Sequence, residues 1–427
     1  MSKELPYLVF SDSEGKIYHH PYLRMLGRSL DRDSLPKPQE LISMPKGSSF
    51  FYLPGRKPLG FNPATRAIET LEEFNGKPAF AVAAFPIPGY LRLYTPSAEV
   101  LSKKILPLWA YTACGFSRGG FYIAAKKVDP RVRQSPRFYD NRLVKQGVKS
   151  FLSRNPKNRL YLHLANCAVN YNCLAAKNLF LRRWEAPLPT ARSCNAGCLG
   201  CLSFQDKGPC ASHNRINFGP RVEELSEVMV NHLKVAKEAI VSFGQGCEGE
   251  PLLEADIIAK AIVKTRQLTK RGTINMNTNG SLPKKIKLLC ESGIDSFRVS
   301  LNSPSEKFYN LYFKPRGYRF GDVLKSIAEA KKYKKFVSIN LLVFPGFSDS
   351  NSQTKTLVKF VRNTGIDMIQ WRNLNIDPES YRKLITSENL KPQGVLNLVA
   401  AIKKEFPRVK LGYFNLPREQ LKSFKNL

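Results

Sequence analysis

Ala239-Ile-Val-Ser-Phe243 has the composition of a buried strand, residues 253–268 have the apolar spacing of a helix, and Thr273-Ile-Asn-Met276 predicts the next strand. The same alternation continues on both sides. Further strand-like runs occupy residues 179–184, 296–301, 337–344 and 368–371, and helical patterns occupy residues 222–236, 284–292, 320–333, 352–364 and 393–405. Repeated strand–helix units predict a parallel sheet with right-handed crossovers.

Six such units predict an α/β fold of the partial (β/α)6, TIM-like barrel type, in which chemistry gathers at the carboxyl ends of the strands. The earlier part of the chain differs, because short aromatic and β-branched runs there are separated by Pro and Gly. We therefore expect a β-rich α+β N-terminal domain over residues 1–178 and the barrel over residues 179–427.

A cysteine cluster, Cys194-Asn-Ala-Gly-Cys198-Leu-Gly-Cys201, follows the first predicted strand of the series. This spacing lets three thiolates from one loop hold a [4Fe–4S] cluster and leave its fourth iron without a protein ligand. The alternative is a structural zinc site with Cys210 as the fourth ligand, since zinc also favours four thiolates.

Four later motifs, in order and each at a predicted strand end, accompany the cysteine cluster. They are Gly249-Glu-Pro within residues 243–253, Asn277-Thr-Asn-Gly280, Arg298-Val-Ser-Leu-Asn-Ser303 and Val343-Phe-Pro-Gly346. Together with the cysteines, this set resembles the radical S-adenosylmethionine (SAM) superfamily over about residues 180–376. The resemblance implies a [4Fe–4S] cluster that cleaves SAM to a 5′-deoxyadenosyl radical, fed by an external flavodoxin- or ferredoxin-like electron donor.

The resemblance also implies a SAM site. Gly249 and Glu250 would receive the amino group of SAM, and a carboxylate suits an ammonium group. The implied SAM-binding residues are Gly249, Glu250, Asn279, Ser300, Asn302, Pro345 and Arg372. The sequence departs from the family at Gly200, where an aromatic residue is common, so we expect the adenine contact from elsewhere, with Phe204 as the candidate.

The other cysteines suggest further chemistry. An auxiliary Fe–S cluster is one interpretation of Cys114, Cys167, Cys173 and Cys210, and burial as small apolar residues is the other. Cys247 precedes Gly249 and is a candidate catalytic residue, as a hydrogen donor or covalent acceptor, with packing as its alternative. His163 alternates with leucines in Leu160-Tyr-Leu-His-Leu164, which is typical of a core residue.

The charge is unusual, because 67 Lys and Arg against 34 Asp and Glu give a formal net charge of +33. Such an excess favours a polyanionic partner. Between residues 126 and 159 there are eleven basic residues and two acids, with aromatic residues interleaved. The candidate RNA-binding residues are Lys126, Lys127, Arg131, Arg133 and Arg137.

Three functions follow from these observations. The first is a radical SAM enzyme that modifies RNA (tRNA or rRNA), and the second is one that acts on a peptide or small metabolite. The third is a non-catalytic zinc protein that binds nucleic acid. No apolar run approaches the roughly 20 residues that cross a bilayer, and no signal pattern opens the chain, so we expect a cytoplasmic protein with no membrane partner.

Overall fold

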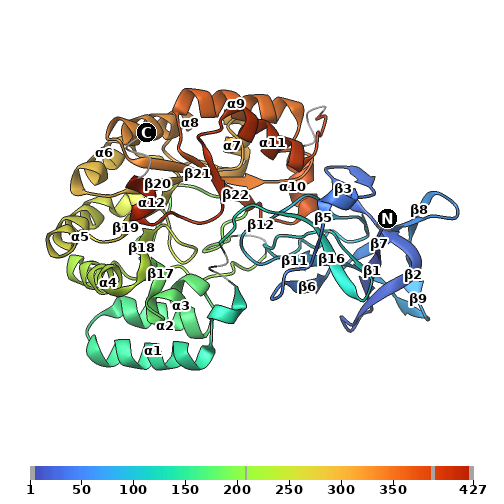
Figure 1. Cartoon of the computed structure of the whole chain (residues 1–427), viewed down its shortest axis with the longest axis horizontal. Coiled ribbons are helices and arrows are strands. Elements are labelled where there is room, and N and C mark those ends of the chain that lie inside the picture. The colour runs from blue at the N-terminus through green and yellow to red at the C-terminus, as the bar shows by residue number, and fades with distance from the viewer. Residues whose placement is uncertain (1–4, 132, 134, 207–208, 386–389, 423–427) are drawn as a thin grey trace.

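The computed structural model describes residues 5–131, 133, 135–206, 209–385 and 390–422. Its first part is built from short strands, as predicted (Figure 1). They are β1 (Tyr7–Ser11), β2 (Ile17–Met25), β3 (Gly27–Ser29), β4 (Arg32–Ser34), β5 (Leu41–Ser43), β6 (Ser49–Tyr52), β7 (Arg56–Asn62), β8 (Ala67–Thr70), β9 (Glu73–Phe74), β10 (Lys77–Pro78), β11 (Phe80–Phe85), β12 (Tyr90–Arg92), β13 (Thr95–Pro96), β14 (Ala98–Val100), β15 (Cys114–Ser117) and β16 (Gly120–Lys127).

Most of these strands form one antiparallel, eleven-stranded sheet whose main path runs β12-β16-β15-β1-β2-β7-β14. The sequence sets its hairpins. Arg118 and Gly119, which join β15 to β16, both have positive φ (50° and 73°). That backbone geometry matches the twist of a two-residue hairpin, and Gly adopts it without strain.

Three helices follow the sheet: α1 (Asn141–Arg154), α2 (Arg159–Val169) and α3 (Leu174–Phe180). One sequence expectation was wrong here. Leu179 lies on α3 rather than in the first barrel strand, which begins only at Arg183, and His163 lies on α2. The three helices share one hydrophobic core with the barrel. The division at residue 178 stays a prediction.

The second part is a parallel α/β half-barrel, which confirms the predicted fold class. Its sheet runs β17 to β23 in chain order, one strand more than predicted. The strands are β17 (Arg183–Pro187), β18 (Lys237–Phe243), β19 (Thr273–Thr278), β20 (Ser296–Leu301), β21 (Phe336–Val343), β22 (Met368–Asn373) and β23 (Lys410–Gly412). The helices are α4 (Val222–Val235), α5 (Ala255–Leu268), α6 (Pro283–Ser292), α7 (Glu306–Phe313), α8 (Phe320–Lys332), α9 (Asn351–Thr364), α10 (Pro378–Ile385), α11 (Val395–Glu405) and α12 (Arg418–Lys422).

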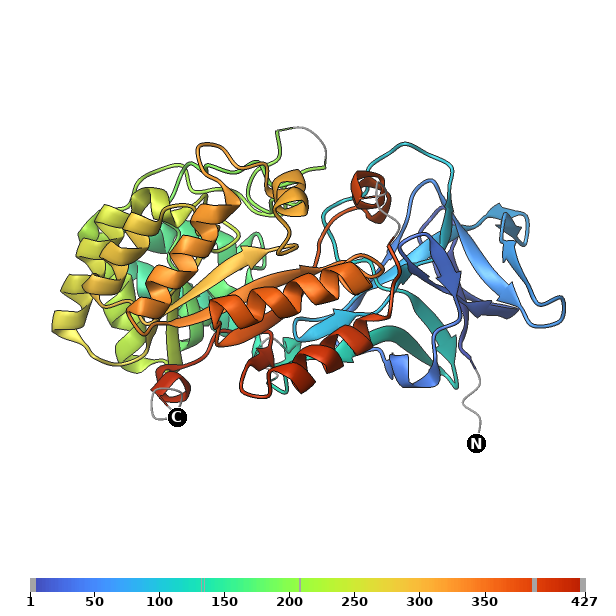
Figure 2. The same cartoon turned by 90° about the horizontal axis from the view of Figure 1, so that it is seen from above.

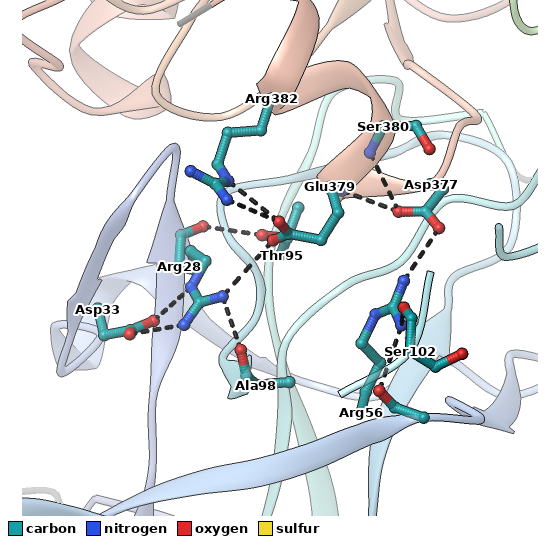
Figure 3. Close-up of polar contacts among 11 residues, drawn as sticks. Arg28, Asp33, Arg56, Thr95, Ala98, Ser102, Asp377, Glu379, Ser380 and Arg382 are labelled. Atoms are coloured by element: carbon teal, nitrogen blue, oxygen red, sulfur yellow. Dashed lines mark hydrogen bonds and ion pairs between the residues drawn. The ribbon is translucent and has the colours of Figure 1, made fainter. Parts of the chain in front are cut away.

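The β-rich part lies at one end of the half-barrel, beside β22 and α10, in both views (Figures 1 and 2). Polar contacts fix it there. The Asn373 side chain accepts a hydrogen bond from Arg92 N (2.9 Å) and donates one to Tyr90 O (3.0 Å). Arg28 and Arg56 reach carboxylates at the start of α10 (Figure 3). This junction covers the carboxyl ends of the parallel strands.

Side chains between the sheet and its helices form the main core, which includes Trp371 and Phe243. Within the described ranges, no helix has the length and apolarity that crossing a membrane requires.

Candidate active site

A cavity of about 410 Å³ lies at the carboxyl ends of the parallel strands, where the fold predicts chemistry. Residues from the barrel loops and strand ends line one side: Cys194, Cys198, Cys201, Arg215, Glu248, Gly249, Glu250, Asn279, Arg298, Ser300, Arg372 and Tyr413. The β-rich part lines the other side with Phe85, Pro86, Pro88 and Ala110. Both parts of the chain therefore form this site.

The loop that carries the three cysteines is fixed to the end of α7. Gly197 N donates to Phe313 O (2.9 Å), and Leu199 N donates to Tyr312 O (3.0 Å). A Cβ atom on Gly200 would lie 2.6 Å from the Tyr312 hydroxyl oxygen, closer than any real contact. Tyr312 therefore occupies the space that a larger side chain at position 200 would need, which explains the glycine there.

The three thiols lie together at the cavity wall. Burial raises the pKa of Cys194 to about 11 and the pKa of Cys198 well above its ordinary value. The Cys201 Sγ lies 3.6 Å from Ser203 Oγ and 3.8 Å from Arg215 Nη2. Thiols of this kind lose their protons when a metal binds, and hydrogen-bond donors near the sulfur stabilise the resulting thiolate.

This donor set fits a [4Fe–4S] cluster better than one zinc ion. Four ligands of a single zinc crowd together, with Zn–S bonds of about 2.3 Å, whereas cluster thiolates bind different irons. Among the described residues, the set of three ligand atoms that all lie within 4.8 Å of one another is His163, Cys167 and Cys247, and the loop cysteines form no such set. Cys210, the predicted fourth zinc ligand, is exposed.

The loop after β18 is shaped by the buried carboxylate of Glu248. Its Oε1 accepts hydrogen bonds from the backbone N–H groups of Gly244 (2.5 Å) and Gln245 (3.3 Å). Its Oε2 accepts from the N–H groups of Thr190 (2.8 Å) and Ala191 (3.0 Å). One side chain thus ties this loop to the segment before the cysteines.

Gly249 and Glu250 continue the same loop. A Cβ on Gly249 would lie 1.9 Å from Ser193 O, so only glycine fits. Burial raises the pKa of Glu250 to about 7, and its oxygens accept from Thr278 Oγ1 (2.5 Å) and Asn279 N (2.8 Å). The Glu250 carboxylate keeps acceptor capacity toward the cavity, as recognition of an ammonium group requires.

The structure brings together some of the predicted SAM residues and not others. Those that line the cavity are Gly249, Glu250, Asn279, Ser300 and Arg372. Asn302 and Pro345 are not among its lining residues. The Asn302 amide donates to Phe308 O (3.0 Å) and Tyr381 Oη (3.2 Å), and Pro345 O accepts from Leu30 N (3.1 Å). Both residues thus have structural contacts here.

Sequence reasoning missed Arg298 and Tyr413. Burial, with the nearby Arg372 charge, lowers the pKa of Arg298 to about 9, and the Arg372 guanidinium lies 3.7 Å from the Tyr413 ring centre. Arg298 could have been noticed in the sequence, because it is a charged residue inside the strand predicted over residues 296–301. Tyr413 follows the unpredicted β23. Phe204, the candidate adenine contact, is 55% exposed and does not line the cavity.

The structure does not gather the four proposed auxiliary-cluster cysteines. Cys114 is buried in a separate core of the β-rich part, where it contacts Val82 O (3.8 Å). Cys210 is exposed. Cys167 belongs to the barrel core and lies beside Cys247, whose thiol does not line the cavity although Cys247 was the candidate catalytic residue.

The predicted RNA-binding residues divide into two groups. Arg131 pairs with Asp129 (2.9 Å), and the buried Arg133 pairs with Glu238 (2.9 Å). The exposed ones are Lys126, Lys127 and Arg137. A phosphate contact by Arg133 would have to displace Glu238.

The fold and the site are a parallel half-barrel with three cysteines in the loop after its first strand, an arrangement suited to hold a [4Fe–4S] cluster. Residues 188–361 match the model of the Radical SAM superfamily. Residues 188–361 form a domain of this superfamily, which confirms the resemblance seen in the sequence. The chain is a radical SAM enzyme with a [4Fe–4S] cluster and SAM as cofactors.

Among similar proteins, the GTP 3′,8-cyclase of Aquifex aeolicus is 26% identical over 242 residues, which cover 53% of this chain and 68% of the relative. The probable GTP 3′,8-cyclase of Pyrobaculum aerophilum is 24% identical over 190 residues, covering 42% of this chain and 59% of the relative. The crystal structure of Streptococcus suis SuiB bound to S-adenosylmethionine matches with a TM-score of 0.38 and 16% identity, over 62% of this chain and 59% of that one.

Proposed function

We propose that this radical SAM enzyme acts on a substrate that carries an anionic group, and that Arg298 and Arg372 bind this group. The carrying observation is the pair of guanidinium groups at the cavity wall. The Nε atoms of both arginines are buried without a hydrogen-bond partner. Arg298 donates to Gln370 Oε1 (3.2 Å), and the charge of Glu185 acts on it from nearby, but no ion pair within 4 Å joins either arginine to a described carboxylate. Two neighbouring guanidinium groups, each with a buried Nε atom that lacks a partner, favour an anion that binds to both.

The position of the two arginines favours substrate over SAM. Arg298 lies on the central strand β20 and Arg372 on β22, whereas the cysteine loop follows the edge strand β17. The resemblance assigned Arg372 to SAM. Arg372 lies near Arg298, to which the resemblance assigns no SAM contact, and this supports a substrate role instead.

The chain's own residues divide the work. When bound, the [4Fe–4S] cluster supplies the electron that cleaves SAM to methionine and a 5′-deoxyadenosyl radical, which abstracts a hydrogen atom. Cys194, Cys198 and Cys201 would hold that cluster, and Glu250 would accept the SAM ammonium group. The β-rich part forms one wall of the cavity and so restricts the access of water to it.

RNA is the second candidate substrate, and the charge distribution favours it. Besides the net charge of +33, α1 carries Arg142, Lys145 and Lys149 as exposed side chains at helical spacing, so they share one face. Together with the exposed Lys126 and Lys127 they could bind phosphates.

An Fe–S cluster also needs reducing surroundings, which supports the predicted cytoplasmic location.

The test is anaerobic SAM cleavage by the reconstituted protein with dithionite. We expect 5′-deoxyadenosine without added substrate, and none from Cys198→Ala. Host RNA and the small anionic metabolites of a host extract are then added separately, and the stimulated fraction identifies the substrate class. Arg298→Gln and Arg372→Gln should keep substrate-free cleavage and SAM affinity but lose stimulation by ~100-fold, about 3 kcal/mol.

Two results would overturn the proposal. If either arginine variant loses SAM binding, the pair holds SAM and not substrate. If both variants respond to substrate like the wild type, the arginines do not bind it. An RNA response should also fall steeply as salt is raised.

A further inference from the structure

A second group of metal-type ligands lies outside the cavity, in the barrel core. The Nδ1 or Nε2 atom of His163 and the Sγ atoms of Cys167 and Cys247 all lie within 4.8 Å of one another. His163 Nε2 is 3.6 Å from Cys167 Sγ. Both cysteines are 2% exposed. Two buried thiols beside a half-buried imidazole are unusual for packing alone.

We propose that His163, Cys167 and Cys247 bind a single structural zinc ion, with Cys173 as the fourth ligand. This site is independent of the [4Fe–4S] cluster and of the proposed substrate.

The separations fit one ion. With Zn–S bonds of about 2.3 Å and Zn–N bonds of about 2.0 Å, a tetrahedral ion places a sulfur and a nitrogen ligand about 3.6 Å apart, and His163 and Cys167 have this separation. Ligands of a [4Fe–4S] cluster bind different irons and stand further apart. The geometry therefore favours one ion here over the auxiliary Fe–S cluster predicted from Cys114, Cys167, Cys173 and Cys210.

Local structure explains how residues so distant in sequence meet. His163 and Cys167 are four residues apart on α2, so their side chains share one face of the helix. Cys247 lies in the loop after β18, where its carbonyl accepts from Ile216 N (2.8 Å). Its neighbour Glu248 fixes this loop through four backbone N–H groups.

Cys173 is the best candidate for the fourth ligand. Its N–H donates to Cys167 O (2.9 Å), which holds it beside the group at the start of α3. The Cys173 thiol acts electrostatically on both Cys167 and Cys247. The competing candidate, His213, has an electrostatic interaction with Cys167. A turn of the Cys173 side chain toward the other three would complete a Cys3His set, which is a closed structural zinc site.

A zinc ion at this site would connect α2 to the loop that carries Gly249 and Glu250. By holding Cys247, it would also restrict the positions of these two residues. Loss of zinc should therefore loosen this loop and weaken SAM binding, even though no zinc ligand lines the cavity.

The experiment counts metals and sulfide in the full chain, expressed with iron and zinc supplied. We expect ~1 zinc per chain in addition to ~4 iron and ~4 sulfide of the [4Fe–4S] cluster. His163→Ala, Cys167→Ser, Cys173→Ser and Cys247→Ser should each lower zinc by ~10-fold or more. Cys290→Ser, a buried cysteine on α6, should keep zinc.

Iron content reports whether each variant still folds. Should the variants fail to fold, cobalt replaces zinc in the wild-type chain, and a tetrahedral cobalt–thiolate spectrum that zinc abolishes supports the site. Wild-type protein without zinc and without that spectrum would overturn it. So would additional iron and sulfide beyond one cluster. Zinc retained by Cys173→Ser alone would overturn the assignment of the fourth ligand.

Discussion

The guanidinium of Arg56 lies 3.3 Å from the carboxylate of Asp377, and both side chains are almost fully buried (Figure 3). Arg56 begins β7 in the β-rich part, and Asp377 precedes α10 in the half-barrel. Asp377 also accepts a hydrogen bond from Leu106 N (2.7 Å). A single carboxylate thus connects two parts of the chain that together enclose the cavity.

We predict that Asp377→Asn destabilises the protein by about 3–5 kcal/mol, because it leaves the Arg56 charge buried without a counter-charge. Thermal or urea unfolding measures the effect. The matched control is Glu72→Gln, which removes an ion pair with Lys57 in which the Glu72 side chain is 66% exposed. That change should cost less than about 1 kcal/mol. Equal effects of the two variants would contradict the prediction.

Gly249→Ala should abolish cluster assembly. The added Cβ would lie 1.9 Å from Ser193 O, so the backbone next to Cys194 must move. We expect iron content and SAM affinity to fall by ~10-fold or more, measured after anaerobic reconstitution. Gly219→Ala is the control, because its Cβ meets no atom within 4 Å. A Gly249→Ala protein with full iron would show that the loop adapts.

The strand–helix alternation and the cluster loop with Cys194, Cys198 and Cys201 could be predicted from the sequence, because each depends on a pattern within a short stretch of residues. The helix α2 was not predicted, and the leucines at every second position from Leu160 were interpreted only as a sign of core residues, although Leu162 is in fact exposed. The strand β23 is only three residues long and leaves no periodic signal.

The rest of the site depends on contacts between distant segments. Arg298 and Tyr413 line the same cavity because of the order of strands in the sheet, which no local pattern in the sequence records. The same holds for Cys167 and Cys247, which are adjacent only because α2 packs against the barrel. Sequence analysis could name these cysteines but could not pair them.

His232 should make the protein acid-sensitive. Burial lowers the pKa of His232 from its ordinary value of 6.5 to about 4, with smaller opposing effects of the Trp184 carbonyl (2.7 Å) and the nearby Glu185 charge. Between these two values the unfolded chain binds the proton and the folded chain does not. Stability is therefore lost as the pH falls through this window, by about 3 kcal/mol in all.

The measurement compares urea unfolding of the wild type and of His232→Gln at several pH values from about 7 to 4. Gln keeps an N–H donor for the Trp184 carbonyl but does not titrate. The stability difference between the two proteins should narrow or reverse in favour of the variant as the pH falls. A difference that does not change with pH would contradict the assignment.

Arg215 should set the reduction potential of the cluster. Its guanidinium lies 3.8 Å from Cys201 Sγ and donates to Ser203 Oγ (3.1 Å), so it places positive charge beside one cluster ligand. Reduction adds an electron, and a nearby cation favours the more negative state. Arg215→Gln should therefore shift the midpoint potential by ~50 mV to more negative values, about 1 kcal/mol for one electron. A redox titration followed by electron paramagnetic resonance measures this shift.

The control is Lys403→Gln, which removes an exposed charge on α11 and should leave the potential unchanged. An equal shift in both variants would mean that only the overall charge matters. Because Arg215 contacts a cysteine ligand of the cluster, we expect Arg215→Gln to keep its SAM affinity. Its rate of 5′-deoxyadenosine formation relative to the wild type should be lower with a weak reductant than with a strong one.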